Sequence, residues 1–345
     1  MKAIALISGG LDSTLATRLV KDLGIELVCL NTVSPFCLCS RRSSSGCFYG
    51  AGRVAKDLDL ELVSINVAEE FLEIVKEPKY GYGSNMNPCI DCRILLFKKA
   101  KETMHREGAS FVITGEVLGQ RPMSQKLNTM RLIEKEAGLD GLVLRPLSAK
   151  VLEPTIPEKQ GWILRDRLLA LTGRGRHEQI DLARELGIND YPCPSGGCLL
   201  TDPQFCKRLK DLMQHEQFNL DNIQLLKVGR HFRLTDTAKL VVGRNEKENE
   251  RLLNLAKEND YLFFPNDGLA GPNSLGRGIF SEELIELSCG ITSRYCDLNG
   301  TESAKILYRI VGTRPQSLPA CRQGDSPLSL NVVPLDDVKL KDLRI

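Results

Sequence analysis

Six residues near the start of the chain combine glycine, hydroxyl and carboxylate side chains, which are the types that bind phosphate. Ser8-Gly9-Gly10-Leu11-Asp12-Ser13 follows the apolar run 3–7 and precedes residues 14–23, whose apolar positions recur at helical spacing. The glycines therefore lie on a strand-to-helix turn, where backbone N–H groups and the positive end of the helix dipole bind an anion. A carboxylate beside phosphate needs a cation between them, so Asp12 indicates Mg²⁺ bound with a nucleotide.

The alternative interpretation of this turn is structural, with Asp and Ser serving only to cap the helix. The chain contains no G-x-x-x-x-G-K-[ST] sequence, so the lysine of that nucleotide loop is missing. The hexapeptide instead resembles the loop of the PP-loop ATP pyrophosphatases, which adenylylate a carbonyl oxygen and release pyrophosphate. The predicted ATP-binding residues are Ser8, Gly9, Gly10, Asp12 and Ser13, and Asp12 is also predicted to be catalytic.

A pair of cysteines, Cys89 and Cys92, comes just before a helix that we expect to start near Arg93. Thiolates are favoured at a helix N-terminus, and C-x-x-C spacing places both sulfurs on one side of a turn. Three interpretations are open. In the first, Cys89, Cys92 and Cys198 hold an iron–sulfur cluster that leaves one iron open to sulfide. In the second, the same three cysteines and Cys193 hold a structural zinc. In the third, no metal is bound, and one cysteine carries persulfide sulfur while another resolves it.

We choose Cys198 over Cys193 as the third cluster ligand for reasons of backbone flexibility. Cys193 lies between two prolines, which fix φ and remove backbone donors, whereas two glycines precede Cys198. Three further cysteines, Cys37, Cys39 and Cys47, lie in the loop 34–52, which could cover the adenine or bind something of its own.

The elements that must position these residues alternate between strand and helix. Strand-like runs occur at residues 3–7, 26–31, 61–67, 110–114 and 142–144, with helical patterns between most of them. This alternation predicts an α/β fold with a doubly wound parallel sheet, whose ligands bind at the carboxyl ends of the strands. We therefore expect Gly9, Gly115 and the segment after Asn31 to meet at one edge of the sheet.

The pattern changes near Asp202, which indicates a second domain. A helical stretch at 161–186 leads into a turn-rich segment, and short strands with charged turns follow. We predict an ATP-binding domain of the PP-loop type over 1–202, a smaller α+β domain over 203–315 and an irregular tail over 316–345.

Composition excludes several classes of protein. The 345 residues carry 46 Lys and Arg against 44 Asp and Glu, so any nucleic-acid contact must use a local patch. Twelve cysteines fit metal, cluster or thiol chemistry better than disulfides. Four histidines without an H-E-x-x-H motif argue against a histidine-based zinc hydrolase. The chain has no apolar run that could span a membrane, and we expect it to be cytoplasmic.

The segment 114–133 resembles the corresponding stretch of the tRNA 4-thiouridine synthetases, and the two cysteine segments, 87–92 and 195–198, are similar to those of the tRNA 2-thiouridylases. The resemblance implies that Gly115 contributes to the ATP site and that Cys92 and Cys198 are catalytic. It also implies that the substrate is bound by Gln120, Ser124 and Gln125. The rhodanese-like sulfur carrier and N-terminal RNA-binding portion of the family are not recognisable, so the sulfur donor stays open between sulfide and the persulfide of a cysteine desulfurase.

Residues 225–308 resemble the RNA-binding domain of the NFACT ribosome-associated proteins. Basic residues on its expected short strands could form a phosphate patch, with Arg230, Arg233 and Arg244 as predicted substrate-binding residues beside Lys227, His231 and Lys239. The alternative is an ordinary solvated face, since acidic residues nearly balance the basic ones.

These features together predict an ATP-dependent tRNA sulfurtransferase that adenylylates a uridine carbonyl and replaces its oxygen with sulfur. Its predicted cofactors are ATP, Mg²⁺ and a 4Fe-4S cluster, with zinc as the alternative, and its predicted partners are tRNA and a sulfur donor. Two other functions stay open. One is an ATP pyrophosphatase that thiolates or amidates a small molecule or cofactor, and the other is a non-catalytic RNA-binding protein with structural zinc.

Overall fold

The computed structural model describes residues 1–38, 46–189, 191, 197–298, 300–312 and 327–345, without the side chains of 46–49. The chain divides into two compact units, Met1–Pro203 and Gln204–Ile345. This division lies next to the boundary expected near Asp202. None of the described helices is both long enough and apolar enough to cross a membrane.

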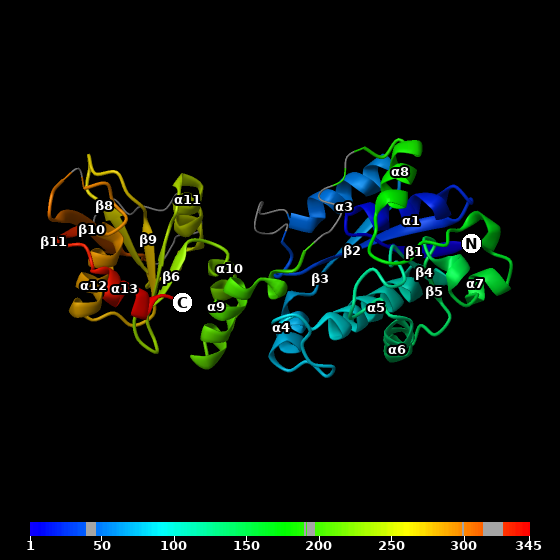
Figure 1. Cartoon of the computed structure of the whole chain (residues 1–345), viewed down its shortest axis with the longest axis horizontal. Coiled ribbons are helices and arrows are strands. Elements are labelled where there is room, and N and C mark those ends of the chain that lie inside the picture. Colours follow the sequence, from blue (N-terminus) through cyan, green and yellow to red (C-terminus); the bar gives the residue numbers. More distant parts are fainter. Residues whose placement is uncertain (39–45, 190, 192–196, 299, 313–326) are drawn as a thin grey trace. The chain divides into compact units, whose positions relative to one another are not determined.

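The first unit is built on a five-stranded parallel sheet (Figure 1), so the predicted α/β class is confirmed. The strands are β1 (Lys2–Leu6), β2 (Glu26–Val33), β3 (Glu61–Asn66), β4 (Phe111–Thr114) and β5 (Val143–Leu144), in the spatial order β3-β2-β1-β4-β5. Each expected strand-like run is present as a strand. Because β1 lies between β2 and β4, the strand order reverses there, and such a reversal is where open α/β sheets bind ligands.

Helices cover both faces of this sheet, and alternate residues of its central strands face opposite sides. Ala3 and Phe111 belong to the core under α1 (Leu11–Lys21) and α8 (His177–Glu185). Ile4 and Val112 belong to the core under α5 (Cys89–Arg106) and α6 (Leu127–Ala137). Among the described residues, the other α-helices of the unit are α3 (Gly46–Asp57), α4 (Ala68–Lys76) and the short α7 (Ile156–Lys159).

Two helix predictions are wrong. The stretch 161–186 contains only the short 3₁₀ helix Arg165–Arg167 and α8, which starts at His177. Gly173 has a φ of +79°, a backbone conformation that ends regular helix, and Gly175 follows two residues later. Helix α5 begins at Cys89 rather than near Arg93, because Pro88 supplies the N-cap and Cys92 N–H already donates to Pro88 O at 2.9 Å.

The second unit holds a six-stranded antiparallel sheet in the order β11-β10-β8-β9-β7-β6. Its strands are β6 (Arg230–Arg233), β7 (Lys239–Val242), β8 (Tyr261–Pro265), β9 (Ser274–Arg277), β10 (Ala304–Ile310) and β11 (Leu328–Val332). Its helices are α9 (Pro203–Gln214), α10 (Leu220–Leu225), α11 (Glu246–Leu255), α12 (Glu282–Ser293) and α13 (Asp337–Leu343). The core includes Phe232, Leu240, Phe263 and Ile306.

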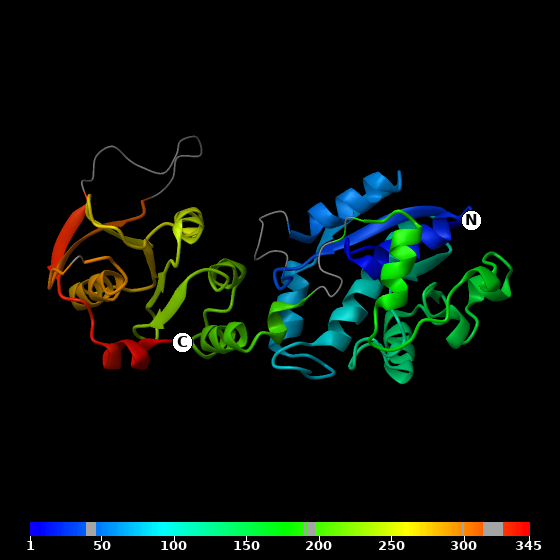
Figure 2. The ribbon, with the colours of Figure 1, turned by 45° about the horizontal axis from the view of Figure 1, so that its top comes forward.

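The expectation of an irregular tail from residue 316 is wrong for the described residues 327–345. Strand β11 pairs with β10 from Leu328 to Val332 (Figure 2, red beside orange), and α13 follows. Val332 and Leu340 are buried in the core of the unit. The chain after residue 327 therefore completes the second domain. Residues 316–326 lie outside the described residues.

Candidate active site

The predicted phosphate loop connects β1 to α1, and no side chain caps the first N–H groups of the helix. Gly10 is the N-cap of α1, so the interpretation that Asp12 and Ser13 serve as caps is not supported. Ser13 Oγ accepts from Ser8 N–H at 3.3 Å and donates to Gly10 O at 3.0 Å, which fixes the turn. The first N–H groups of α1 can therefore bind an anion.

Gly9 is required at this turn on two grounds. Its φ of +72° lies in the left-handed region, and a Cβ there would lie 2.5 Å from the backbone carbon of Gly50 in α3. The loop is thus packed directly against the first turn and a half of α3, which comes from the crossover after β2.

Asp12 lies in the first turn of α1 with one carboxylate oxygen unsatisfied. Its Oδ1 is buried and has no hydrogen-bond partner among the described residues, while Oδ2 lies 3.5 Å from Nη1 of Arg176. Burial raises the pKa of Asp12, and the charge of Arg176 and the amide of Gln120 oppose that rise. A buried, unpaired carboxylate oxygen beside free helix N–H groups is a donor set that fits a nucleotide-bound Mg²⁺ ion.

Gly115 brings the end of β4 against this same turn, as the sequence predicted. A Cβ on Gly115 would lie 2.5 Å from the carbonyl carbon of Asp12 and from the nitrogen of Ser13. Only glycine allows this approach, so the carboxyl ends of β1 and β4 meet at the phosphate loop.

A buried ionic network fixes the chain just beyond Gly115. The carboxylate of Glu116, 1% exposed, lies 3.1 Å from Nε of Arg145 and 3.3 Å from Nε of Arg93. Arg145 also pairs with Glu134 of α6. The network ties the ends of β4 and β5 to α5 at the residue that follows Cys92, and so connects the nucleotide turn to the cysteine pair.

The predicted substrate-binding residues of the first unit are buried, and each carries one polar side-chain atom without a hydrogen-bond partner among the described residues. Gln120, Ser124 and Gln125 are 8%, 1% and 2% exposed. Gln120 Nε2, Ser124 Oγ and Gln125 Oε1 make no hydrogen bond within the described part of the chain. A buried unsatisfied polar group costs about 1–3 kcal/mol, so three together indicate a site that a ligand or water completes.

Cys89 and Cys92 lie three residues apart in the first turn of α5. The amide of Asn87 donates to Cys89 Sγ at 3.3 Å. Burial raises the pKa of Cys92 to about 11, although the charge of Arg93 opposes the rise. The expected stabilisation of the Cys92 thiolate by its helix terminus is therefore outweighed by burial.

The segment that carries Cys198 packs beside the segment before Cys89. Met86 N–H donates to Leu200 O at 3.1 Å, and the backbones of Cys198 and Cys37 form an isolated antiparallel β-bridge. Even so, no three His, Cys, Asp or Glu side chains among the described residues are close enough to hold a metal ion. The segments that carry Cys89, Cys92 and Cys198 are thus in contact, but the three thiols are not within metal-binding distance of one another. Cys198 is a thiol, whereas Cys37 is in a disulfide, so the expectation against disulfides is wrong for Cys37. Cys39, Cys193 and the Cys47 side chain lie outside the described residues.

Sequence reasoning missed two arginines at this site. Arg176, at the N-cap of α8, is the residue that reaches Asp12. The guanidinium of Arg121 interacts electrostatically with Asp12 and with Cys89. The available signal for Arg176 was its place in Gly173-Arg174-Gly175-Arg176, a basic, glycine-rich turn directly before a helical pattern.

The basic residues predicted to bind RNA in the second unit are mostly used inside it. Arg233 forms two bonds to Asp211, at 3.0 and 2.5 Å, and Lys239 lies 3.3 Å from the same carboxylate. Lys227 and His231 are 3% and 2% exposed, and Arg244 pairs with Glu248. An RNA-binding role for Arg233 is therefore not supported by its position.

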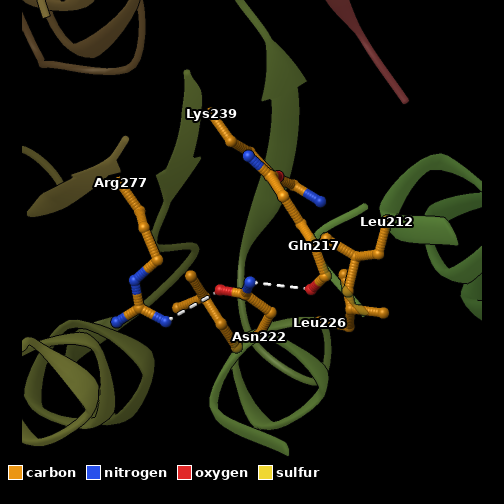
Figure 3. Close-up of a pocket in the computed structure, with 7 residues that line it drawn as sticks. Leu212, Gln217, Asn222, Leu226, Lys239 and Arg277 are labelled. Carbon is orange, nitrogen blue, oxygen red and sulfur yellow. Dashed lines mark hydrogen bonds between the residues drawn. The ribbon is translucent and has the colours of Figure 1, made fainter. Parts of the chain in front are cut away.

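Figure 3 shows how Lys239 and Arg277 line a small cavity of this unit. Arg277 Nη1 donates to Asn222 Oδ1 at 3.1 Å, and the Asn222 amide donates to Gln217 O at 2.8 Å. The cavity measures about 10 Å³, which is room for one water molecule. These basic side chains consequently stabilise the interior of the domain.

The two parts of the chain match the models of two different protein families. Residues 1–151 match the model of the family described as thiamine biosynthesis protein (ThiI), and residues 229–322 match the NFACT protein RNA binding domain. A probable tRNA sulfurtransferase of Methanosarcina mazei is 26% identical over 230 residues, which cover 64% of this chain and 47% of that protein. The chain thus spans about half the length of this curated relative.

Two solved structures are similar to the chain at low TM-score. One is a 4-thiouridine synthetase in complex with RNA and ATP, with 23% identity and a TM-score of 0.38 over 66% of this chain and 52% of the other. The second is the U34-tRNA thiolase NcsA of Methanococcus maripaludis with its [4Fe-4S] cluster, with 14% identity and a TM-score of 0.34 over 65% and 70% of the two chains.

Proposed function

Because the chain joins a domain of the ThiI family to an RNA-binding domain of the NFACT type, we propose that it is an ATP-dependent tRNA sulfurtransferase. The relative from Methanosarcina mazei is described as a probable tRNA sulfurtransferase, which supports this activity. The structural observation that carries the proposal is the uncapped start of α1 with the buried, unpaired Oδ1 of Asp12 beside it.

In the first half-reaction, the loop holds ATP while a uridine carbonyl oxygen attacks the α-phosphorus and pyrophosphate leaves. The N–H groups at the start of α1 bind phosphate oxygens, and the guanidinium of Arg176 is placed to bind another. Asp12 would hold Mg²⁺, which neutralises phosphate charge when bound. Gln120, Ser124 and Gln125 supply the unsatisfied polar atoms that orient the base or the nucleotide.

The second half-reaction replaces the adenylylated oxygen by sulfur. Oxide is a poor leaving group, whereas AMP is a good one, so adenylylation makes displacement by a sulfur nucleophile possible. The nucleophile is supplied by the cysteine side of the site, with Cys92 and Cys198 as the proposed catalytic residues. Arg121 interacts with both Asp12 and Cys89, so it can stabilise negative charge that develops between the nucleotide loop and the cysteine pair.

We also propose that Cys89, Cys92 and Cys198 hold an iron–sulfur cluster. The contact of Met86 with Leu200 supports this set, because it brings the two cysteine segments together. Since the thiols are not gathered at metal-binding distance, cluster binding requires the segment 197–201 to move toward α5. We likewise propose that the sulfur comes from sulfide or from the persulfide of a cysteine desulfurase. We also propose that the second unit binds tRNA.

The test of the activity is Asp12→Ala, assayed by tRNA-dependent release of pyrophosphate from ATP and by mass spectrometry of thiolated nucleosides. We expect both to be lost while the fold is retained, because the carboxylate proposed to bind Mg²⁺ is removed. Asp22→Ala, which removes an exposed carboxylate after the other end of α1, is the matched control. Comparable turnover by the Asp12 variant would show that the loop is structural.

The test of the metal centre is metal analysis of protein purified without oxygen. We expect close to four iron atoms per chain, and we expect Cys198→Ser to lose both iron and thiolation while Cys296→Ser, in the second unit, keeps both. Zinc at one per chain without iron would establish the structural-zinc alternative, and active protein without metal would favour the persulfide pair. A Cys193→Ser variant that loses iron while Cys198→Ser retains it would refute the choice of third ligand.

A further inference from the structure

The last residues of the chain form one wall of a cavity in the second unit. The cavity measures about 250 Å³ and is lined by Arg294, Tyr295, Asp337, Leu340, Lys341 and Arg344. Its lining residues come from the end of α12 and from α13, which are adjacent in Figure 1. An ion pair of 3.0 Å between Arg294 and Asp337 joins the two helices. This cavity was not predicted from the sequence, because α13, which forms one of its walls, lies in the stretch expected to be an irregular tail.

The side chains that line this cavity carry a net positive charge, and they include cationic side chains that are exposed to solvent. Three cationic side chains line it against one carboxylate, and that carboxylate is already paired with Arg294. Lys341 and Arg344 are exposed. This differs from Arg233 and Lys239, whose charges are neutralised inside the domain by Asp211. The cavity is therefore a place in this unit where cations are available to an external anion.

The aromatic wall of the cavity is held rigidly. The guanidinium carbon of Arg230 lies 4.4 Å from the centre of the Tyr295 ring, and Arg230 Nη1 donates to Gly243 O at 2.9 Å. Arg344 forms a backbone bridge with Phe232 on the same strand as Arg230, and Ile345 N–H donates to His231 O at 3.1 Å. The chain terminus thus places two exposed cations beside a fixed aromatic ring.

We propose that this cavity is the nucleotide-binding site of the RNA-binding domain, where it takes one unpaired nucleotide of a tRNA. Lys341 and Arg344 bind the two phosphates that adjoin this nucleotide, and the nucleoside lies against Tyr295. Unpaired bases are recognised by contact with aromatic rings, while Lys and Arg side chains bind the adjoining phosphates. A volume of about 250 Å³ is below the ~300–1,000 Å³ of most small-molecule pockets, which suits one residue of a polymer. The inference rests on the proposed function, since it names where the second unit contacts tRNA.

The experiment measures the affinity of the full chain for fluorescein-labelled tRNA by anisotropy over a range of salt. The double variant Lys341→Ala/Arg344→Ala removes the two exposed cations. Lys247→Ala/Lys305→Ala is the matched control, because both lysines are exposed in the same unit and neither lines the cavity. Tyr295→Leu tests the ring separately from charge.

We expect the Lys341/Arg344 variant to bind tRNA at least about tenfold more weakly at moderate salt. The slope of log affinity against log salt should fall by about 1.5, as expected for two lost phosphate contacts at about 0.7–0.9 each. The Lys247/Lys305 control should change neither quantity. Tyr295→Leu should weaken binding without changing the salt slope, because a stacking contact releases no counterions.

The outcomes separate this inference from the proposed function. If the wild-type chain binds tRNA and the cavity variants match the control, the inference is overturned while the proposed function stands. If the wild-type chain shows no salt-dependent tRNA binding, both are overturned. If polyglutamate displaces tRNA as readily as oligouridylate does, the cavity binds acidic polymers without regard to nucleotides, and the inference is overturned.

Discussion

At the scale of single residues, the pairing of Asp12 with Arg176 is the feature that most constrains the chemistry. The two charges lie 3.5 Å apart, which is longer than a good hydrogen bond and leaves both groups able to turn to a ligand. Asp12 comes from the first turn of α1 and Arg176 from the start of α8, so the pair encloses the loop from two elements.

Replacement of Arg176 tests this arrangement. Arg176→Ala should lower ATP-dependent pyrophosphate release by about 10²–10³, the loss typical of a preorganised donor that stabilises developing charge. Arg176→Lys should recover only part of the rate, because an ammonium group cannot form the two-pronged contact with phosphate. Arg184→Ala, an exposed arginine on the same helix, is the control. Full activity in Arg176→Ala would assign Arg176 to packing alone.

Asp12 also affects stability, with a sign that follows from its raised pKa. Because burial raises the pKa in the folded state, ionised Asp12 costs folding free energy above that pKa, so Asp12→Asn should raise the urea midpoint at pH 7. The gain should shrink as pH falls through the folded pKa and vanish below the unfolded value of about 4. Fluorescence of Trp162, the one tryptophan of the chain, reports on the first unit. A lower midpoint at pH 7 would mean that the Arg176 pairing outweighs burial.

At the scale of elements, the site depends on how closely β4 approaches the first turn of α1. The approach is possible only at Gly115, and the ionic network of Glu116, Arg145 and Arg93 then fixes the direction in which the chain leaves the strand. Removing one member of such a buried network costs about 3–5 kcal/mol, because the remaining charges lose their partner. The elements are therefore held in place by packing and charge together.

Gly115→Ala tests the approach. The added Cβ would overlap backbone atoms of Asp12 and Ser13, so α1 must shift at a cost of about 1–3 kcal/mol. We expect the affinity for ATP to fall at least about tenfold with a lower Trp162 unfolding midpoint. Gly52→Ala in α3 is the control, since its nearest neighbour would be 4.0 Å away. An ATP affinity equal to that of the wild type would show that the turn tolerates the shift.

At the scale of the whole molecule, the chain pairs a unit that holds the candidate active site with a second unit that has its own core. The cores of Met1–Pro203 and Gln204–Ile345 share no residue, and each unit carries its own sheet. We therefore expect the two proposed tasks, activation of uridine and binding of tRNA, to be separable.

Truncation after Pro203 tests that separation. The shortened protein should retain ATP binding and the unfolding midpoint reported by Trp162, because the cores around α1 and α5 are intact. Its affinity for tRNA should fall, and its salt dependence should become shallower, since the phosphate contacts of the second unit are lost. Unchanged tRNA affinity in the truncated protein would remove RNA recognition from residues 204–345.

The class of the fold and the position of the phosphate loop could be predicted from local sequence patterns. Apolar runs of strand length alternate with helical periodicity, and this local pattern reports which residues must be buried on each element. The glycine-rich hexapeptide and Gly115 were found for the same reason, because turns at strand ends depend on residue types that are close in sequence. Each of the five predicted strands of the first unit was confirmed on these grounds.

Which charged residues are available to a ligand could not be predicted from the sequence, because it depends on the packing of the folded chain. Arg233 and Lys239 look like an RNA-binding patch on their strands, but Asp211 of α9 neutralises both. Arg176 looks like a surface residue until α8 packs beside α1 and places it next to Asp12. The tail 327–345 looks irregular because its strand pairs with a partner distant in sequence. Burial and ion pairing depend on such non-local neighbours, which no local pattern encodes.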